Sequence, residues 1–173
     1  MLQHIEALDL RLCRRLNRQL ALTGVREVFV LVSRLGNGMF WYALIVALPL
    51  LTDPPAVGAA VQMAATGMIA TGLHGILKTA LSRERPFMTS PSITCACPPL
   101  DRYSFPSGHT LHAVCFTTIA VHHVPALAWI LLPFTMLVMA SRIVLGLHYP
   151  SDVAAGAALG LGLALASCTL FGV

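Results

Sequence analysis

Three long apolar runs, separated by short polar breaks, dominate this chain. Residues 56–77, 111–141 and 153–173 contain no Asp, Glu, Lys or Arg. A helix that crosses a bilayer needs about 20 such residues, so each run is long enough to span a membrane. The sequence His122-His123-Val124-Pro125 divides the middle run in two, because proline favours a helix boundary.

We therefore predict a bundle of about five membrane-spanning helices. Their expected bounds are residues 38–52, 55–81, 107–123, 125–146 and 150–172. Asp53-Pro54-Pro55 is expected to form a tight turn between the first two spans. Gly156 and Gly160 have the spacing that allows close packing of the last helix against a neighbour.

The N-terminal stretch has a different periodicity. Ile5, Leu8, Leu12, Leu16 and Leu20 recur every three to four residues, which predicts an amphipathic helix over residues 3–20. The other positions of this helix include four arginines, Arg11, Arg14, Arg15 and Arg18. The pattern suits a helix that lies in the membrane interface and equally a helix packed as a cap over the bundle.

A second short interfacial helix is expected over residues 25–34, ended by Gly36-Asn37-Gly38. Trp41 and Tyr42 follow, and we expect both to be interfacial anchors of the first span. The chain thus divides into an N-terminal amphipathic interfacial segment, residues 1–36, and a transmembrane core, residues 37–173.

Composition supports an integral membrane protein of the all-α class. The 173 residues are 57% hydrophobic and 10% charged, with a mean hydropathy of +0.78; soluble domains carry about 25% charged residues. The five cysteines show no metal-ligand spacing, and Cys95 and Cys97 are too few to indicate a disulfide framework. We expect a membrane and a lipid as partners, with no nucleic acid, no metal and no cofactor.

Three polar clusters interrupt the apolar runs at predicted helix ends. They are Lys78 to Pro86, Pro106-Ser107-Gly108-His109, and Ser141-Arg142 with His148 and Asp152. Because successive spans alternate in direction, all three clusters are expected at the same membrane face. Charged side chains at such depth are costly and usually functional.

The first two clusters have the chemistry of an anion site. Lys78 and Arg85 supply positive charge, and the planar guanidinium can hold two phosphate oxygens. Pro106 is expected at the first position of a helix, so that the N–H groups of Ser107 and Gly108 point outward toward an anion. His109 stands beside them and can donate a proton.

The third cluster adds a candidate nucleophile. Pro150 is expected at the first helical position, with His148 before the helix and Asp152 near its third residue. Asp152 could hold the Nδ1 hydrogen of His148 and leave the other ring nitrogen free to attack. Arg142 supplies a second guanidinium.

Taken together, these clusters resemble the signature motifs of the type 2 phosphatidic acid phosphatase superfamily, which also contains vanadium haloperoxidases. The family pattern is Lys, six residues, Arg-Pro; then Pro-Ser-Gly-His; then Ser-Arg, five residues, His, three residues, Asp. Every position matches, in order. The resemblance covers about residues 38–172.

The resemblance implies a metal-free phosphatase that acts on a lipid phosphomonoester or diphosphate. It implies that His148 forms a phosphohistidine, that Asp152 orients it, and that His109 protonates the leaving group. The remaining motif residues would bind the phosphate: Lys78, Arg85, Ser107, Gly108 and Arg142. Among neighbours, His74 and His112 are expected mainly as packing histidines, whereas Arg83 and Arg102 could meet an anionic headgroup or be solvated.

Other functions stay open at this point. A haloperoxidase that holds vanadate is disfavoured by the long apolar spans, because those family members resemble soluble proteins. A lipid phosphotransferase, or a non-enzymatic lipid-binding protein with a relict site, remains an alternative. The loop from Met88 to Leu100 carries few charges, which favours a small phosphate or diphosphate head, as in polyprenyl diphosphate, phosphatidic acid or phosphatidylglycerol phosphate.

Orientation is the point on which charge and resemblance disagree. Most Lys and Arg residues crowd the side of the clusters, and the positive-inside rule would make that side cytoplasmic. Bacterial members of the family usually have six spans and a periplasmic site, whereas the N-terminal arginines stand here where a span is expected. We expect a bacterial inner membrane and a periplasmic site; the sequence predicts no oligomeric state.

Overall fold

The computed structural model describes residues 2–51 and 55–172, and every regular element within these ranges is a helix. The α-helices are α1 (Leu2–Asn17), α2 (Val25–Leu35), α3 (Met39–Leu51), α4 (Pro55–Leu81), α5 (Pro86–Thr89), α6 (Gly108–His123), α7 (Ala128–Val144) and α8 (Pro150–Phe171), with short 3-10 turns at Arg18–Ala21 and Pro125–Leu127. The all-α prediction is confirmed. The turn predicted at Asp53-Pro54-Pro55 lies outside the described residues, except for the backbone of Pro55, where α4 begins.

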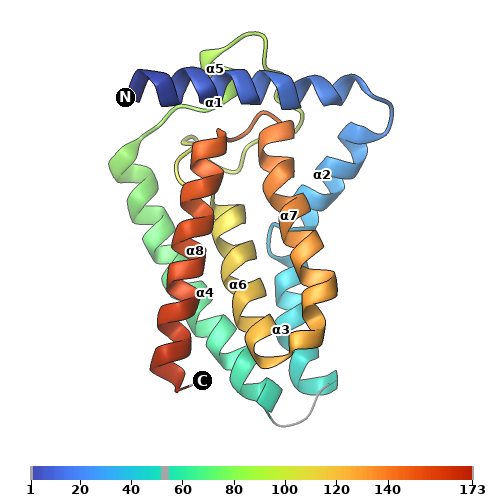
Figure 1. The fold of residues 1–173 in the computed structure, drawn as a ribbon, viewed down its shortest axis with the longest axis vertical. Helices are drawn as coiled ribbons and strands as arrows, with labels where there is room; N and C mark the ends of the chain where they lie inside the picture. Colours follow the sequence, from blue (N-terminus) through green and yellow to red (C-terminus); the bar gives the residue numbers. More distant parts are fainter. Residues whose placement is uncertain (1, 52–54, 173) are drawn as a thin grey trace.

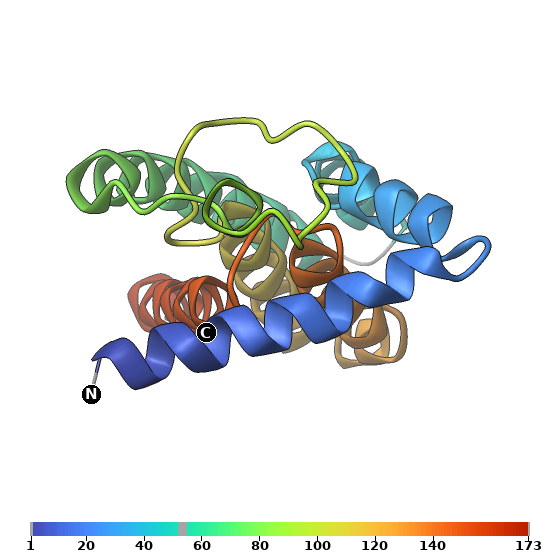
Figure 2. The same cartoon turned by 90° about the horizontal axis from the view of Figure 1, so that it is seen from above.

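The long helices form an upright bundle, and α1 lies across one end of it (Figures 1 and 2). α6 stands at the centre and packs against α4, α7 and α8. The closest approach is to α8: a Cβ added at Gly156 would stand 2.6 Å from the Ser107 carbonyl oxygen, and one at Gly160 would collide with the Leu111 backbone. The predicted close packing of Gly156 and Gly160 is confirmed, and it presses the start of α6 against α8.

Within residues 2–51 and 55–172, three helical segments are long and apolar enough to cross a membrane: Val57–Thr89, Pro125–Val144 and Pro150–Phe171. A fourth crossing arises if α2 and α3, which meet at a bend of 52°, form one broken span. α6 has only 16 residues, or about 24 Å of helix, and runs between the longer helices. The predicted five spans are reached only by counting both the bent pair and the central α6.

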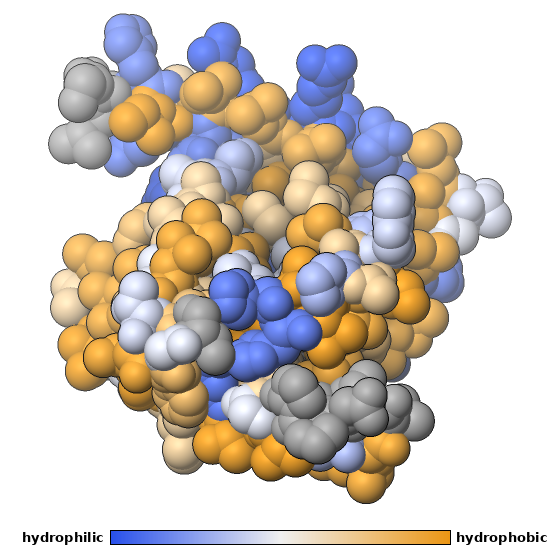
Figure 3. All heavy atoms as spheres, turned by 60° about the horizontal axis from the view of Figure 1, so that its bottom comes forward, coloured by the Kyte–Doolittle hydropathy of each residue, from blue (hydrophilic) through white to orange (hydrophobic). Residues whose placement is uncertain are grey.

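The face of the molecule shown in Figure 3 is largely apolar around a central hydrophilic patch. Large hydrophobic side chains stand out from several helices, among them Leu50, Met68, Trp129 and Leu170, each at least 73% exposed. Exposed apolar surface of this extent marks a membrane or interaction surface. Together with the spans, it confirms an integral membrane protein.

α1 turns mainly a polar stripe toward the bundle, and Leu10 packs partly buried beside it. Asp9, Cys13 and Asn17, four residues apart, are buried, whereas Ile5 and Leu8 are 44% and 49% exposed. The helix is therefore a cap over the bundle, which was one of the two predictions for it. The outward position of Ile5 and Leu8 also suits a helix that lies in the membrane interface, and that placement stays a prediction.

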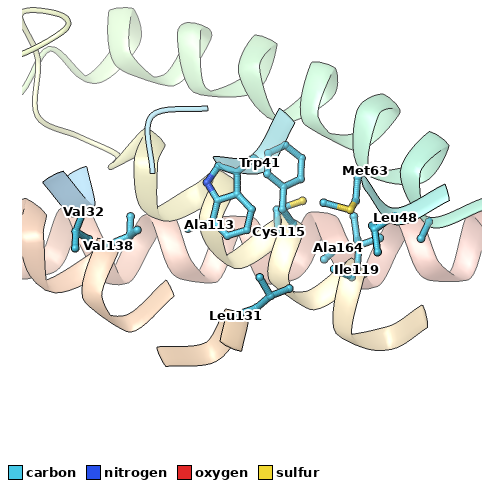
Figure 4. Packing of buried hydrophobic residues seen from close by; sticks show 13 residues of the cluster. Val32, Trp41, Leu48, Met63, Ala113, Cys115, Ile119, Leu131, Val138 and Ala164 are labelled. Carbon is cyan, nitrogen blue, oxygen red and sulfur yellow. The ribbon is translucent and has the colours of Figure 1, made fainter. Parts of the chain in front are cut away.

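The core lies around α6 and includes Trp41, Met63, Ile119 and Leu131 (Figure 4). Trp41 is fully buried, and its Nε1 donates to the Gly36 carbonyl oxygen at 3.3 Å. The prediction that Trp41 is an interfacial anchor is therefore wrong. Neighbouring residues on a helix point about 100° apart, so the bend that turns Trp41 inward leaves Tyr42 68% exposed.

Candidate active site

The three predicted clusters meet at the end of the bundle beneath α1. Lys78 lies in the last turn of α4, and Gly108 begins α6. Arg142 lies in the last turn of α7, and Asp152 lies in the first turn of α8. Lys78, Arg85, Arg142, His148 and Asp152 are each at most 7% exposed. The structure thus brings the clusters together at one face, as alternating helix directions predicted.

Arg85 is the centre of this end. Its Nη1 donates to the Leu147 carbonyl oxygen at 2.8 Å and lies 3.3 Å from His148 Nε2. Its Nη2 donates to Asp101 Oδ1 at 2.8 Å. The guanidinium is therefore fixed beside the imidazole nitrogen that the sequence assigned to attack.

Asp101, which the sequence reasoning missed, also pairs with Lys78. Lys78 Nζ donates further to the Tyr103 carbonyl oxygen at 2.8 Å. Burial disfavours the Asp101 carboxylate, but the hydrogen bond from Lys78 and the charges of Lys78 and Arg85 outweigh it and lower the pKa of Asp101. The Asp101 carboxylate thus already balances the charges of Lys78 and Arg85. A bound phosphate must share these two cations with Asp101 or displace its carboxylate. The sequence offered one indication of this role, because Asp101 is an acidic residue shortly before Pro106.

His148 and Asp152 face each other as expected, although without a hydrogen bond. His148 Nδ1 stands 3.6 Å from Asp152 Oδ2, which is too long for one, and this nitrogen has no other partner. Burial lowers the pKa of His148 well below its ordinary value, and the charges of Arg142, Arg85 and Lys78 act in the same direction. The imidazole is therefore neutral, as a nucleophile must be.

The start of α8 confirms the predicted positions of Pro150 and Asp152. Pro150 is the first residue of the helix, and Asp152 Oδ2 accepts the backbone N–H of Tyr149 at 2.8 Å. The backbone N–H of His148 donates to the Arg142 carbonyl oxygen at 3.0 Å. The segment from Arg142 to Asp152 is thus held as one unit by local bonds.

The second cluster differs from the prediction in two respects. α6 begins at Gly108 with Ser107 as its N-cap, so Pro106 is not the first helical residue. The Ser107 N–H does not point outward, because it donates to the Asp152 carbonyl oxygen at 3.1 Å. The close contact between α6 and α8 imposes this bond, which leaves the start of α6 at Gly108 and His109 to face the cavity.

Three histidines line the cavity near this helix start: His74, His109 and His112. His112 bonds the Gly108 carbonyl oxygen at 2.9 Å and Thr71 Oγ1 at 3.1 Å, as a packing histidine should. His74 Nε2 is buried without a partner, and a Cβ on Gly108 would stand 2.6 Å from it. A side chain at position 108 would therefore require the His74 ring to move.

Arg142 and Arg83 take different positions. Arg142 lines the cavity, donates to Ser33 Oγ of α2 and keeps its Nε unpartnered. Arg83 turns away from it, since its Nη1 lies 2.6 Å from Asp152 Oδ1 and its guanidinium covers the Tyr149 ring at 4.0 Å. Arg83 is therefore not simply solvated, and that expectation for it is wrong, whereas its contact with an anionic headgroup stays a prediction.

The polar end opens into a cavity of about 640 Å³. Its walls below the charged residues come from α3, α4 and α6 and include Ile45, Met63, Met68 and Phe116. From Lys78 to Met63 the cavity follows 15 residues of α4, or about 22 Å. Charge at one end and apolar walls along the rest suit an amphiphile with an anionic head.

Among curated proteins, the chain is 37% identical over 100 residues to the bacitracin transport permease protein BcrC of Bacillus licheniformis, covering 57% of this chain and 48% of that one. It is 30% identical to an undecaprenyl-diphosphatase of Sulfolobus acidocaldarius, covering 77% of this chain and 64% of that one. The chain thus spans 48% and 64% of the lengths of these two relatives. A probable lipid phosphate phosphatase beta of Arabidopsis thaliana is 31% identical, with 79% and 77% covered.

Solved structures show the same architecture. Aquifex aeolicus LpxE superposes with a TM-score of 0.82 at 27% identity, covering 94% of this chain and 95% of that one. A transmembrane phosphatidylglycerolphosphate phosphatase of Bacillus subtilis, with a TM-score of 0.77 at 24% identity and 96% and 86% covered, shares the fold. The model of the PAP2 superfamily matches residues 56–172, the same span that holds all three clusters, and the chain therefore belongs to this superfamily.

Proposed function

We propose that this protein is a metal-independent lipid phosphatase that works through a phosphohistidine. The observation that carries the proposal is the neutral His148, whose Nε2 lies 3.3 Å from the buried Arg85 at the head of a long apolar cavity. A nucleophile, a phosphate clamp and a place for a lipid chain thus share one space.

In the proposed reaction, the lone pair on His148 Nε2 forms a bond to phosphorus and the ester P–O bond breaks. His109 gives its proton to the leaving oxygen. Water, deprotonated by His109, then attacks the phosphohistidine, so that the N–P bond breaks and inorganic phosphate leaves. Asp152 stabilises the positive charge that develops on the imidazole, once the 3.6 Å gap has closed to hydrogen-bond length.

The phosphate oxygens are stabilised by fixed charges. Lys78, Arg85 and Arg142 line or border the cavity head, and the helix start at Gly108 adds a backbone N–H. Ser107 contributes by holding that helix start, because its own N–H is engaged by α8.

The substrate we propose has a small phosphate or diphosphate head on a long apolar chain. Relatives named for undecaprenyl diphosphate and for decaprenylphosphoryl-5-phosphoribose support a polyprenyl chain, which the apolar cavity walls would accept. Phosphatidic acid and phosphatidylglycerol phosphate are the competing substrates.

The first experiment measures phosphate release by purified wild type and His148→Ala in detergent with EDTA. The substrates are polyprenyl diphosphate, phosphatidic acid, phosphatidylglycerol phosphate and lipid A. Release by wild type alone, with both proteins folded, is expected. If EDTA abolishes release and magnesium restores it, the metal-free mechanism is wrong; if the variant keeps wild-type rates, the phosphohistidine is wrong.

We further propose that the site faces the periplasm of a bacterial inner membrane. The site and the C-terminus lie at opposite ends of the bundle (Figure 1), so this orientation puts the C-terminus in the cytoplasm. A C-terminal green fluorescent protein fusion should then fluoresce, and a C-terminal alkaline phosphatase fusion should be inactive. The reverse pair of results would put the site in the cytoplasm, as the arginine distribution favours.

A further inference from the structure

The buried polar stripe of α1 contacts the catalytic segment at successive turns. Asp9 binds Ser151 at the start of α8, and Cys13 Sγ lies 3.5 Å from the His148 carbonyl oxygen. Asn17 Nδ2 donates to the Val144 carbonyl oxygen at 2.9 Å. Burial raises the pKa of the Cys13 thiol to about 12, so the thiol keeps its proton and can donate it. One helix thus spans the segment that carries His148 and Asp152.

Asp9 is the charged member of this stripe and is 3% exposed. Its Oδ1 accepts the backbone N–H of Ser151 at 3.0 Å, and its Oδ2 pairs with the Ser151 hydroxyl. Ser151 is the second residue of α8. A carboxylate from a distant helix therefore caps α8, where negative charge is favourable.

Arg83 joins Asp9 to the catalytic pair. Its Nη2 donates to Asp9 Oδ2 at 2.9 Å, and its Nη1 donates to Asp152 Oδ1 at 2.6 Å. The other oxygen of Asp152 is the one that faces His148 Nδ1. The guanidinium is therefore shared between two buried carboxylates, of which only one belongs to the proposed reaction.

We propose that Asp9 is a positioning residue for the His148–Asp152 pair and acts through Arg83. The inference rests on the proposed phosphatase function and names a residue outside its motifs. Asp9 balances part of the Arg83 charge. Without that balance the guanidinium is drawn fully onto Asp152, and the carboxylate is less able to accept from His148 Nδ1 and to stabilise the charged phosphohistidine.

The test is Asp9→Asn, which keeps the shape of the side chain and an oxygen for the Ser151 N–H. We expect kcat to fall roughly 10-fold, an effect of the size known for partners that orient metal-bound histidines. The inhibition constant of inorganic phosphate should change less than about 2-fold, because the cations at the cavity head are untouched. Glu6→Gln is the matched control, an exposed carboxylate on the same helix, and should leave kcat within about 2-fold.

A double-mutant cycle separates positioning from general support of the fold. If Asp9 acts through Arg83, Asp9→Asn should cost little more in an Arg83→Gln background than Arg83→Gln costs alone. Asp9→Glu, which restores the charge, should regain part of the lost kcat.

Three results would overturn the inference. They are an unchanged kcat in Asp9→Asn, losses that simply multiply in the double variant, or a weakening of phosphate inhibition that matches the loss of kcat. An inactive wild type would instead refute the proposed function, so the two failures are distinguishable. If Asp9→Asn does not fold, Arg83→Lys takes its place, and an unchanged kcat in that variant would count equally against the proposal.

Discussion

The two ends of the bundle both hold histidines and buried polar side chains, yet their hydrogen bonding differs. At the end remote from α1, Gln62 is fully buried, and its Nε2 donates to Ser167 Oγ at 2.8 Å. Its Oε1 lies 2.7 Å from His123 Nε2. These side chains are neutral and satisfy one another.

The end beneath α1 is charged and incompletely bonded. Among the described residues, three buried side-chain nitrogens lack a partner: His74 Nε2, Arg142 Nε and His148 Nδ1. All three residues line the same cavity. Because each unpaired buried polar group costs free energy, three such groups in one cavity indicate a site where a ligand supplies the missing partners. The polar side chains at the opposite end instead stabilise the fold.

The most severe test of this comparison is Asp152→Asn. The amide can present its N–H₂ group to His148 and disfavour the correct tautomer, so kcat should fall by a factor on the order of 10²–10⁴. Phosphate release by purified protein measures it. His123→Ala at the opposite end is the control and should keep activity within about 2-fold; equal losses at both ends would erase the distinction between them.

His109→Ala should cost a factor of about 10²–10⁴ on a lipid phosphate, whose alkoxide needs a proton to leave. On an activated aryl phosphate the loss should be much smaller. The ratio of the two rates is the measurement, with His112→Ala as the neighbouring control. Equal losses on both substrates would contradict the proposed acid role.

Arg85→Lys tests whether the fork geometry matters or only the charge. A lysine cannot bond Leu147, Asp101 and a phosphate together, and charge-assisted hydrogen bonds contribute about 1.5–3 kcal/mol. We expect kcat/KM to fall roughly 10- to 100-fold. A near-normal kcat/KM would show that only the positive charge at this position matters, not the geometry of the guanidinium.

The pH dependence should reflect the lowered pKa of His148. The nucleophile is active when neutral, and burial with the surrounding cations lowers its pKa well below 6.5. The acid limb of kcat/KM should therefore lie well below pH 6.5, with activity retained through pH 6. An acid limb at or above 6.5 would show that the buried cations do not govern this imidazole.

The smallest effect on activity is expected for Gln62→Ala. Removal of the amide takes away the partner of His123 Nε2 and one of the two hydrogen bonds of Ser167 Oγ, which still donates to the Ala164 carbonyl oxygen. The free energy of unfolding should fall by about 1–3 kcal/mol. Phosphate release below the melting temperature should stay within about 2-fold of wild type. Thermal unfolding in detergent and a phosphate assay on the same sample measure both quantities.

Much of the site could be predicted because helix ends carry it. Lys78, Arg142 and Asp152 lie in terminal turns, and alternating helix directions place those ends together. The N-cap position and the N–H bond of Ser107 could not be predicted, because they depend on how closely Gly156 lets α8 approach. The burial of Trp41 likewise depends on the bend between α2 and α3.

The sequence by itself determined the membrane class, the helices and the three motifs, because apolar run length and residue spacing are local properties. Only the tertiary structure decided that Asp101 balances Lys78 and Arg85, and that Asp9 reaches Ser151 from 142 residues away. Such contacts depend on the angles and distances at which helices pack. Those are set by side-chain fit over the whole bundle, and no local pattern records them.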